Sequence, residues 1–387
     1  MPGRLWPRCG VGPSIHRTMN GISDSPAGFA TGYETARQAW LRAVAARDGQ
    51  LHGLRHPGQG PDGEALWQDV ARFGDPDAES VFVVVCGTHG IEGHAGSAVM
   101  TAWLREDGPG ALPQGVGVVL VHAVNPWGMA YWQRGTENNV DLNRNFLAFP
   151  DLPSPNTGYA ELHPHLMLAD WNETEIARAF DAMDAFRARV GEQAFSNAFN
   201  GGQYLHADGI FYGGDRPEWA NTALRAQLSR HLANARRCVL IDLHTGIGPY
   251  GQPFMINFDP PGSFGRERAR EVWGDAALSG AGSTHAALAS FQGLMIDAFA
   301  GALPDCELSA TAVEFGTLER RRMQRAHLAN AWMRRQARDS DALRRASAEY
   351  REAFIPSDPA WRASVLRAGV ALCRRGRDAL VATAQAR

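Results

Sequence analysis

Three continuous apolar runs constrain the fold of this 387-residue chain more than any other feature. They read VFVVV at 81–85, VGVVLV at 116–121 and CVLIDL at 238–243. Runs of this kind are typical of strands that are covered on both faces, because neither face alternates with polar residues that would meet water. We therefore predict an α/β fold with a central mixed, largely parallel sheet and helices on both faces.

Helical spacing is visible in several other segments. Residues 33–47 are rich in Ala and Arg, and an Ala-rich segment spans 96–105, so a helix is predicted in each. Residues 171–200 predict one long helical segment, and the tail from about 318 is rich in helix-forming residues. The segment 50–65 is rich in Gly, His and Pro, which leaves both a hairpin and a loop open.

The beginning of the chain differs in composition from the rest. Residues 1–18 are dominated by Pro, Gly and Arg, and we expect them to form a disordered leader. No low-complexity linker divides residues 19–387, which are expected to form a single catalytic domain. The basic patches of the helical tail are interspersed with acidic residues, which favours a solvated or docked tail over a nucleic-acid site.

Composition excludes some classes of function. With 20% charged residues and a net charge of −3, the chain has no global field that favours nucleic acid or an anionic membrane. No apolar run approaches the roughly 20 residues that a membrane span needs. The five cysteines are scattered, which is typical of free thiols in a reducing compartment. We expect a cytoplasmic protein with neither nucleic acid nor a membrane as partner, and the oligomeric state stays open.

His89 and Glu92 follow the first apolar run and lie three residues apart. A histidine and a carboxylate at this spacing can bind one metal ion and leave other coordination positions free. A catalytic zinc commonly has three such ligands, so the third is expected at the end of another strand. His244 follows CVLIDL in the same setting. The sequence therefore predicts one zinc ion per chain on these three residues.

Other histidines compete for this role, but none of them has a carboxylate at comparable spacing. We expect each to be a core, surface or substrate-contact residue before a metal ligand. They are His94, His122, His163, His165 and His206.

The segment NNVDLNRNF at 138–146 is unusually dense in Asn, Asp and Arg. Arg144 beside Asn143 can bind a substrate carboxylate through a charge-assisted pair and a hydrogen bond. Asp141 can accept the second N–H of a ligating histidine and so fix its tautomer. An Asx-rich turn with an exposed arginine is the alternative for this segment.

Glu314 lies in the strand-like segment AVEFGT at 312–317, between two apolar residues. A carboxylate in apolar surroundings can have a raised pKa and exchange protons near neutrality, which suits a general base. An outward-facing residue of an alternating strand is the alternative.

Together these four segments resemble the zinc carboxypeptidase superfamily, which includes the M14-type metallopeptidases and their aspartoacylase and succinylglutamate desuccinylase relatives. Within it, the chain most resembles the bacterial DUF2817 family. The motifs HxxE, DLNRNF, DLHTG and VEFGT occur in the family's order between residues 81 and 317. The phrases HAVNPWGMAYWQRGTENN, GGQYLHADGIFYGG and HTGIGPYG are also similar to DUF2817 proteins.

The resemblance implies roles for the residues of these motifs. It places zinc on His89, Glu92 and His244, with Asp141 orienting His89. It also implies that Glu314 takes a proton from the zinc-bound water and delivers it to the leaving amine.

The same resemblance implies a substrate anchor and an oxyanion partner. Asn143 and Arg144 would bind a substrate carboxylate. Arg134 lies ten residues before Arg144, a spacing that some family members use for the arginine that polarises the scissile carbonyl.

The chain departs from the superfamily in two respects. Carboxypeptidases place a mobile tyrosine shortly before the catalytic glutamate, but residues 285–313 contain none, and Tyr250 and Tyr212 are open as replacements. The interval between the second and third zinc ligands is long, which implies a helical insertion around 160–215.

We expect a zinc hydrolase that cleaves an amide or peptide bond next to a carboxylate. The leading hypothesis is a metallocarboxypeptidase that acts on a small peptide or peptide-like substrate. An N-acyl amino acid deacylase is the alternative among enzymes, because it needs the same zinc, base and carboxylate-binding arginine. The alternative of another class is a non-catalytic metal- or ligand-binding protein on the same fold, although all the expected ligands and the base are present here.

Overall fold

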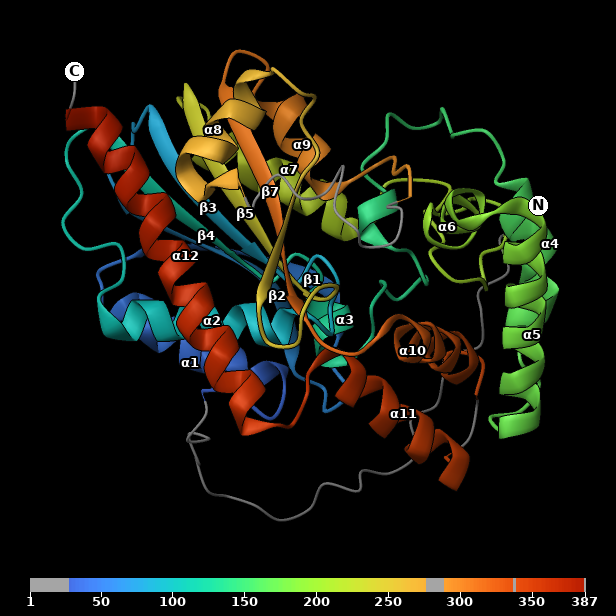
Figure 1. The fold of residues 1–387 in the computed structure, drawn as a ribbon. Coiled ribbons are helices and arrows are strands. Elements are labelled where there is room, and N and C mark those ends of the chain that lie inside the picture. Colours follow the sequence, from blue (N-terminus) through green and yellow to red (C-terminus); the bar gives the residue numbers. More distant parts are fainter. Residues whose placement is uncertain (1–27, 276–288, 337–338, 386–387) are drawn as a thin grey trace.

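The computed structural model describes residues 28–275, 289–336 and 339–385. The leader expected at 1–18 lies outside these residues. In the described part of the chain, seven strands form one sheet in the order β1-β2-β4-β3-β5-β7-β6 (Figure 1). The strands are β1 (Gln50–Gln59), β2 (Ala65–Gly74), β3 (Ser80–Cys86), β4 (Val116–His122), β5 (Arg237–Gly246), β6 (Pro253–Asn257) and β7 (Glu307–Gly316).

The central strands β4, β3, β5 and β7 are parallel, whereas β1, β2 and β6 add antiparallel edges. The prediction of a mixed, largely parallel sheet is therefore confirmed. The three apolar runs of the sequence form β3, β4 and β5. The predicted end of the third strand at His244 is wrong, because β5 stays paired with β7 as far as Gly246 and Gly316.

Helices cover both faces of the sheet, as predicted. Phe82 and Val84 of β3 belong to a core shared with α1 (Tyr33–Ala45), α2 (Gly93–Glu106), α8 (Phe264–Trp273) and α12 (Pro359–Gln385). Val81 and Val83 belong to a second core, shared with α7 (Trp219–His231) and α9 (Met295–Ala302). Successive side chains of a strand point to opposite faces, so β3 contributes to both cores. Each fully buried side chain of this size stabilises the fold by about 1.5–3 kcal/mol.

A further group of helices lies on the side of the molecule away from α1 (Figure 1). It consists of α4 (Thr157–Leu166), α5 (Glu173–Val190), α6 (Glu192–Asn200), α10 (Arg320–Met333) and α11 (Asp341–Phe354). The prediction of one long helical segment over 171–200 is wrong, because Gly191, with φ +84°, ends α5 and precedes α6. The segment expected as an insertion thus contains helices followed by a non-helical loop at 201–218. The tail after 318 is helical, as expected.

The segment 50–65 takes part in a hairpin of β1 and β2. The sequence pattern does not reveal β2, because several of its buried residues are polar and hide the apolar alternation. Asp69 accepts two hydrogen bonds from Arg37, and Gln68 donates to the carbonyl of Val124. Within the described ranges, none of the helices combines the length and the apolar character that crossing a membrane requires.

Candidate metal centre and cavity

The three predicted metal ligands meet at the carboxyl end of the parallel strands. His89 and Glu92 lie in the turn between β3 and α2, and His244 lies in β5, which pairs with β3. Neighbouring parallel strands end at the same edge of the sheet, so the chain brings these distant segments together. Each residue offers one ligand atom within 4.8 Å of the others, and all three side chains are buried.

The imidazole rings of His89 and His244 have the same arrangement of partners. Their Nδ1 atoms lie 3.1 Å and 2.9 Å from the two carboxylate oxygens of Glu92. On the other side of each ring, Nε2 lies 3.1 Å from Asp141 and 2.6 Å from Asp242, respectively. An aspartate that accepts Nε2–H fixes the tautomer whose Nδ1 lone pair is free. Both rings therefore present Nδ1 to the centre.

Sequence reasoning misses Asp242. This residue precedes His244 by two positions in β5, and residues two apart in a strand share a face. The hydroxyl of Thr88, in the turn after β3, donates to both carboxylate oxygens of Asp242 at 3.0 Å. The D-x-H spacing inside a predicted strand is the signal that identifies such a partner.

The donor set of two imidazole nitrogens and one carboxylate fits a divalent ion of the zinc type. Nδ1 of His89 is buried and makes no hydrogen bond of good geometry to any described residue, although Glu92 is 3.1 Å away. Such an orphaned nitrogen is expected of a metal ligand. Four carboxylates and two guanidinium groups surround the centre. The carboxylates are those of Glu92, Asp141, Asp242 and Glu314, and the guanidinium groups are those of Arg134 and Arg144. With neutral imidazoles, two negative charges remain when Glu314 is ionised and one when it is protonated, and a divalent cation offsets this negative charge.

Burial is the largest single influence on the pKa values of Glu92 and His244, but the neighbouring groups together outweigh it. Burial alone would raise the pKa of Glu92, but His89 and His244 outweigh it and lower this pKa. Burial alone would lower the pKa of His244, but Asp242, and then Glu92, raise it well above its usual value. The centre therefore holds Glu92 as a carboxylate, the form that binds a metal.

Arg134 contacts two carboxylates of the centre. Its Nη1 lies 2.9 Å from Glu92, and its Nε lies 3.0 Å from Asp141. Burial alone would raise the pKa of Asp141, but Arg134, and then His89, lower it well below its usual value. The resemblance implies that Arg134 polarises the scissile carbonyl. In the structure, Arg134 contacts the carboxylate of Glu92 and also lines the cavity next to the centre.

Glu314 lies in β7 directly opposite His244 of β5 in the parallel register. The N–H of Ile247 donates to its Oε2 at 3.4 Å, and its side chain lines the same cavity as His89 and His244. Burial, followed by the negative charge of Glu92, raises the pKa of Glu314 to about 7. A carboxyl group in this state can both take up and release a proton near neutral pH.

Arg144 belongs to the short 3-10 helix η1 (Leu142–Arg144) and lines the cavity together with Asn143. Its two terminal nitrogens donate to the carbonyls of Asn143 and Asn200, each at 2.6 Å. Its Nε is buried and has no hydrogen-bond partner among the described residues. Its guanidinium lies 4.6 Å from the ring of Phe291. The structure thus holds a buried cation at the cavity wall on neutral groups.

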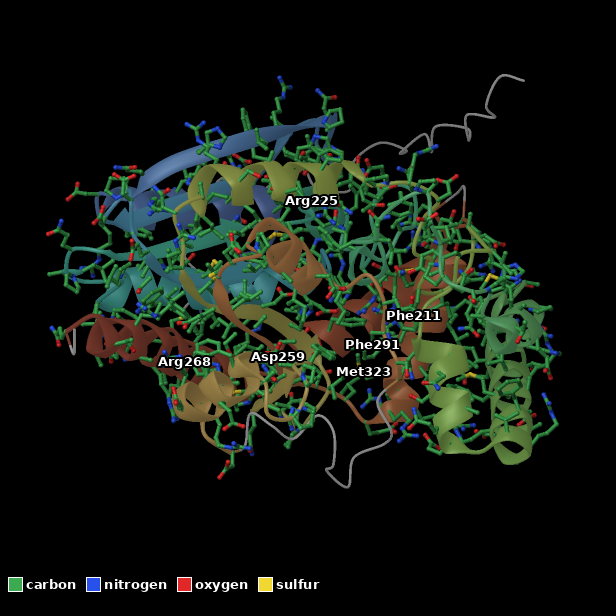
Figure 2. The ribbon with its side chains drawn as sticks, turned by 90° about the horizontal axis from the view of Figure 1, so that it is seen from above. Phe211, Arg225, Asp259, Arg268, Phe291 and Met323 are labelled. Carbon is green, nitrogen blue, oxygen red and sulfur yellow. The ribbon has the colours of Figure 1, made fainter. Side chains whose placement is uncertain are left out.

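The cavity next to the centre has a volume of about 430 Å³. Its wall is rich in aromatic and aliphatic side chains from α6, β6, α10 and the loops between them. Figure 2 shows Phe211, Phe291 and Met323 lying near one another on this wall. Further members are Phe195, Phe199, Phe254, Phe258, Ile256 and Phe354. The cavity therefore combines a charged end at the centre with a large apolar wall.

Residues 29–368 match the family model described as "Protein of unknown function (DUF2817)". The chain belongs to the DUF2817 family. The family expected from the four motifs is therefore confirmed. No curated protein matches the sequence of this chain.

Several solved structures match this chain. One is a candidate metallopeptidase from Shewanella baltica OS155, with 13% sequence identity and a TM-score of 0.43. The match covers 81% of this chain and 91% of the Shewanella chain. The murein-tripeptide amidase MpaA from Escherichia coli O157 has 18% identity and a TM-score of 0.33 over 76% and 97% of the two chains. The succinylglutamate desuccinylase from Chromobacterium violaceum has 14% identity and a TM-score of 0.35 over 83% and 74%. Similarity at this level leaves the reaction to be argued from the chain's own residues.

The tyrosines named as replacements for a mobile tyrosine lie elsewhere in the DUF2817 structure. Tyr250 is exposed and donates its hydroxyl to Asp358 at 3.1 Å. Among the described residues that line the cavity there is no tyrosine, so Tyr212 is not part of its wall either. Another tyrosine, Tyr204, contacts Arg144, because its hydroxyl donates to the carbonyl of Arg144 at 2.7 Å.

Of the competing histidines, His94 and His122 are buried in the core. Nε2 of His94 contacts the carbonyl of Met129 at 3.0 Å, and Nε2 of His122 contacts the hydroxyl of Ser97 at 2.8 Å. Sequence reasoning also misses His327 of α10, which lines the cavity and whose pKa burial lowers to about 3. Its position in a helix without a motif offers no signal in the sequence.

Proposed function

We propose that the protein is a zinc-dependent hydrolase that cleaves an amide bond next to a free carboxylate, as a metallocarboxypeptidase does. One observation carries this proposal: a single cavity is lined by His89 and His244, by Glu314 and by the buried guanidinium of Arg144, and Glu92 offers a ligand atom within 4.8 Å of those of the two histidines. These groups are the metal ligands, the base and the anion anchor that such a reaction needs.

Substrate binding begins at Arg144 and Asn143. The buried guanidinium of Arg144 forms no ion pair with a carboxylate of the described residues, and such a cation favours an anion because charge-assisted hydrogen bonds are stronger in a dry site. Each terminal nitrogen of Arg144 carries two N–H groups and donates one of them to a carbonyl, so a substrate carboxylate can accept from those that remain. The carboxylate fixes one end of the substrate, and the adjacent amide is then directed toward the centre.

The chemistry needs an acceptor for a proton of the attacking water and a donor to the leaving amine. When bound, zinc lowers the pKa of a coordinated water toward ~7 and polarises a carbonyl oxygen. Glu314 accepts the proton on its carboxylate and then donates it to the amine nitrogen. Its pKa of about 7 suits both steps.

Asp141, Asp242 and Arg134 position the groups that react. The two aspartates hold Nε2–H of the histidine rings, so that both Nδ1 atoms would be the ones to bind the ion. Arg134 uses Nε and Nη1 to hold Asp141 and Glu92. We assign its remaining nitrogen, Nη2, to the oxyanion that forms at the cleaved carbonyl.

The test uses zinc-reconstituted protein and three substrate sets: peptides with a free C-terminal carboxylate, the same peptides as C-terminal amides, and N-acyl amino acids. Cleavage of the free acids but not of the amides supports the carboxypeptidase. Turnover confined to N-acyl amino acids identifies a deacylase instead. No turnover in any set overturns the proposal in favour of a binding protein.

Glu314→Gln tests the base. We expect it to bind zinc as the wild type does, while kcat falls about 10²–10⁴-fold, because an amide cannot take up the proton. Glu307→Gln is the matched control, since Glu307 begins the same strand and pairs with Arg237 at 3.0 Å. A Glu314→Gln protein with near-normal kcat removes Glu314 from the mechanism.

A further inference from the structure

A second cluster of metal-binding side chains lies outside the cavity. His163 is in the last turn of α4, and His206 and Asp208 are in the loop at 201–218. Each offers one ligand atom, and these atoms lie within 4.8 Å of one another. Nε2 of His163 lies 3.0 Å from Oδ1 of Asp208, and the two imidazole rings are stacked with centroids 3.9 Å apart.

Nε2 of His206 is buried and has no hydrogen-bond partner among the described residues. A buried polar atom without a partner destabilises the folded state, so folded proteins rarely leave one without a hydrogen bond or a bound ligand. Stacking against His163 satisfies the faces of the ring but not this in-plane nitrogen. An ion bound by His206, His163 and Asp208 accounts for the orphaned atom.

The loop holds the backbone around His206 in place with contacts that leave its ring free. Gln203 accepts the N–H of His206 at 2.7 Å and donates to its carbonyl at 2.7 Å. Asn139 donates to the carbonyls of Ala207 and Gly209, on both sides of Asp208. These contacts keep the three donor groups near one another, and binding of one ion requires the stacked rings to turn so that the in-plane lone pairs of both meet it.

We propose that His163, His206 and Asp208 form a second divalent transition-metal site, separate from the centre at His89. Two imidazoles with one carboxylate select ions of the zinc class over calcium and magnesium, which prefer oxygen ligands. The side chain of Asp208 is partly exposed, so water can complete the coordination. The charge of the nearby Arg335 interacts with Asp208, but its guanidinium donates its hydrogen bonds to the carbonyls of Leu168 and Ala331.

An ion here joins α4 to the loop that supports the two arginines of the cavity. Tyr204, in this loop, donates its hydroxyl to the carbonyl of Arg144. Phe211, farther along it, lies 5.1 Å from the guanidinium of Arg134 and 5.9 Å from that of Arg144. The site thus stabilises the segment against which both cations pack, without touching the cavity itself.

Metal content of the full chain tests this proposal. After reconstitution with zinc and removal of loosely bound metal, we expect two ions per wild-type chain and one per His206→Phe chain. Phenylalanine keeps the stack on His163 but offers no ligand atom. His165→Phe is the matched control, because His165 is an exposed histidine of the same helix, and this variant is expected to keep two ions. One ion in the wild type, or two in His206→Phe, overturns the proposal.

A second measurement separates this site from the catalytic centre. In His89→Ala protein, which lacks a ligand of the first centre, zinc still raises the thermal unfolding midpoint if the second site exists. The increase disappears when Asp208→Asn is added, a change that keeps the size of the side chain. Zinc that leaves the midpoint of the His89→Ala protein unchanged contradicts the second site. The result is independent of whether any peptide is hydrolysed, because it measures binding alone.

Discussion

The carboxylate of Asp242 lies 2.6 Å from Nε2 of His244, on the same face of β5. Thr88 donates to this carboxylate as well, so an amide at position 242 would turn its oxygen to Thr88 and its N–H to His244. The ring would then carry its proton on Nδ1, where the metal binds. We expect Asp242→Asn to lower zinc affinity about 10–100-fold in a chelator competition assay.

Asp259→Asn is the control for this change, because Asp259 accepts a hydrogen bond from Asn257 beside α8 and contacts no residue of the centre among those described. It should bind zinc like the wild type. Equal affinities of Asp242→Asn and wild type would show that Asp242 does not set the tautomer of His244.

The role proposed for Arg144, binding of the substrate carboxylate, leads to a prediction about the charge of the substrate. Arg144→Gln removes the guanidinium, so KM for a substrate with a free carboxylate should rise about 10–100-fold, while its amide counterpart is unaffected. Arg225→Gln is the matched control, because Arg225 also lies over a phenylalanine ring, that of Phe146, at 5.7 Å. A variant that still prefers the acid over the amide would place the anchor elsewhere.

Gly90, between the candidate metal ligands His89 and Glu92, packs against the backbone of α3 (Pro126–Ala130). A Cβ atom at this position would lie 2.1 Å from the carbonyl carbon of Gly128 and 2.3 Å from the nitrogen of Met129. Backbone cannot yield as a flexible side chain can, so Gly90→Ala should destabilise the protein by about 1–3 kcal/mol in urea unfolding and weaken zinc binding. Gly32→Ala, where no atom lies within 4 Å, should change neither. Unchanged zinc affinity would show that the turn tolerates a shift.

The sequence predicts the parts of the site that follow strands. The segments at His89 and His244 each come after a continuous apolar run, and parallel strands that pair must end at one edge of the sheet. That argument needs no tertiary detail, and the structure brings both segments together in β3 and β5.

Other parts of the site depend on packing that leaves no periodic signal. The apolar wall includes Phe195 and Met323 from two helices that are distant in sequence, and helix order does not determine which side chains meet. The contact of Arg134 with Glu92 joins two irregular segments, and the pairing of His163 with His206 joins a helix to a loop, where irregular backbone carries no pattern. Such contacts follow from the tertiary fold alone.

The last prediction concerns acid stability and His122, which is buried on Trp40 and contacts Ser97. Burial lowers the pKa of His122 to about 3, whereas the pKa of a histidine in an unfolded chain is about 6.5. Between these values the unfolded chain binds a proton that the folded chain does not. The contribution of the neutral ring to the free energy of unfolding is therefore fully present above about pH 6.5. It is lost as the pH falls toward about 3, at about 1.4 kcal/mol per pH unit.

The variant His122→Gln keeps a hydrogen-bonding side chain but cannot titrate. It is expected to be less stable at pH 7.5, because the stack on Trp40 is lost, yet its free energy of unfolding should fall less steeply than that of the wild type between pH 6 and 5. The difference in slope should approach one proton, measured by urea unfolding across this range. Identical slopes, or an NMR titration of His122 with a pKa near 6, would show that the folded protein protonates this ring as readily as the unfolded chain does.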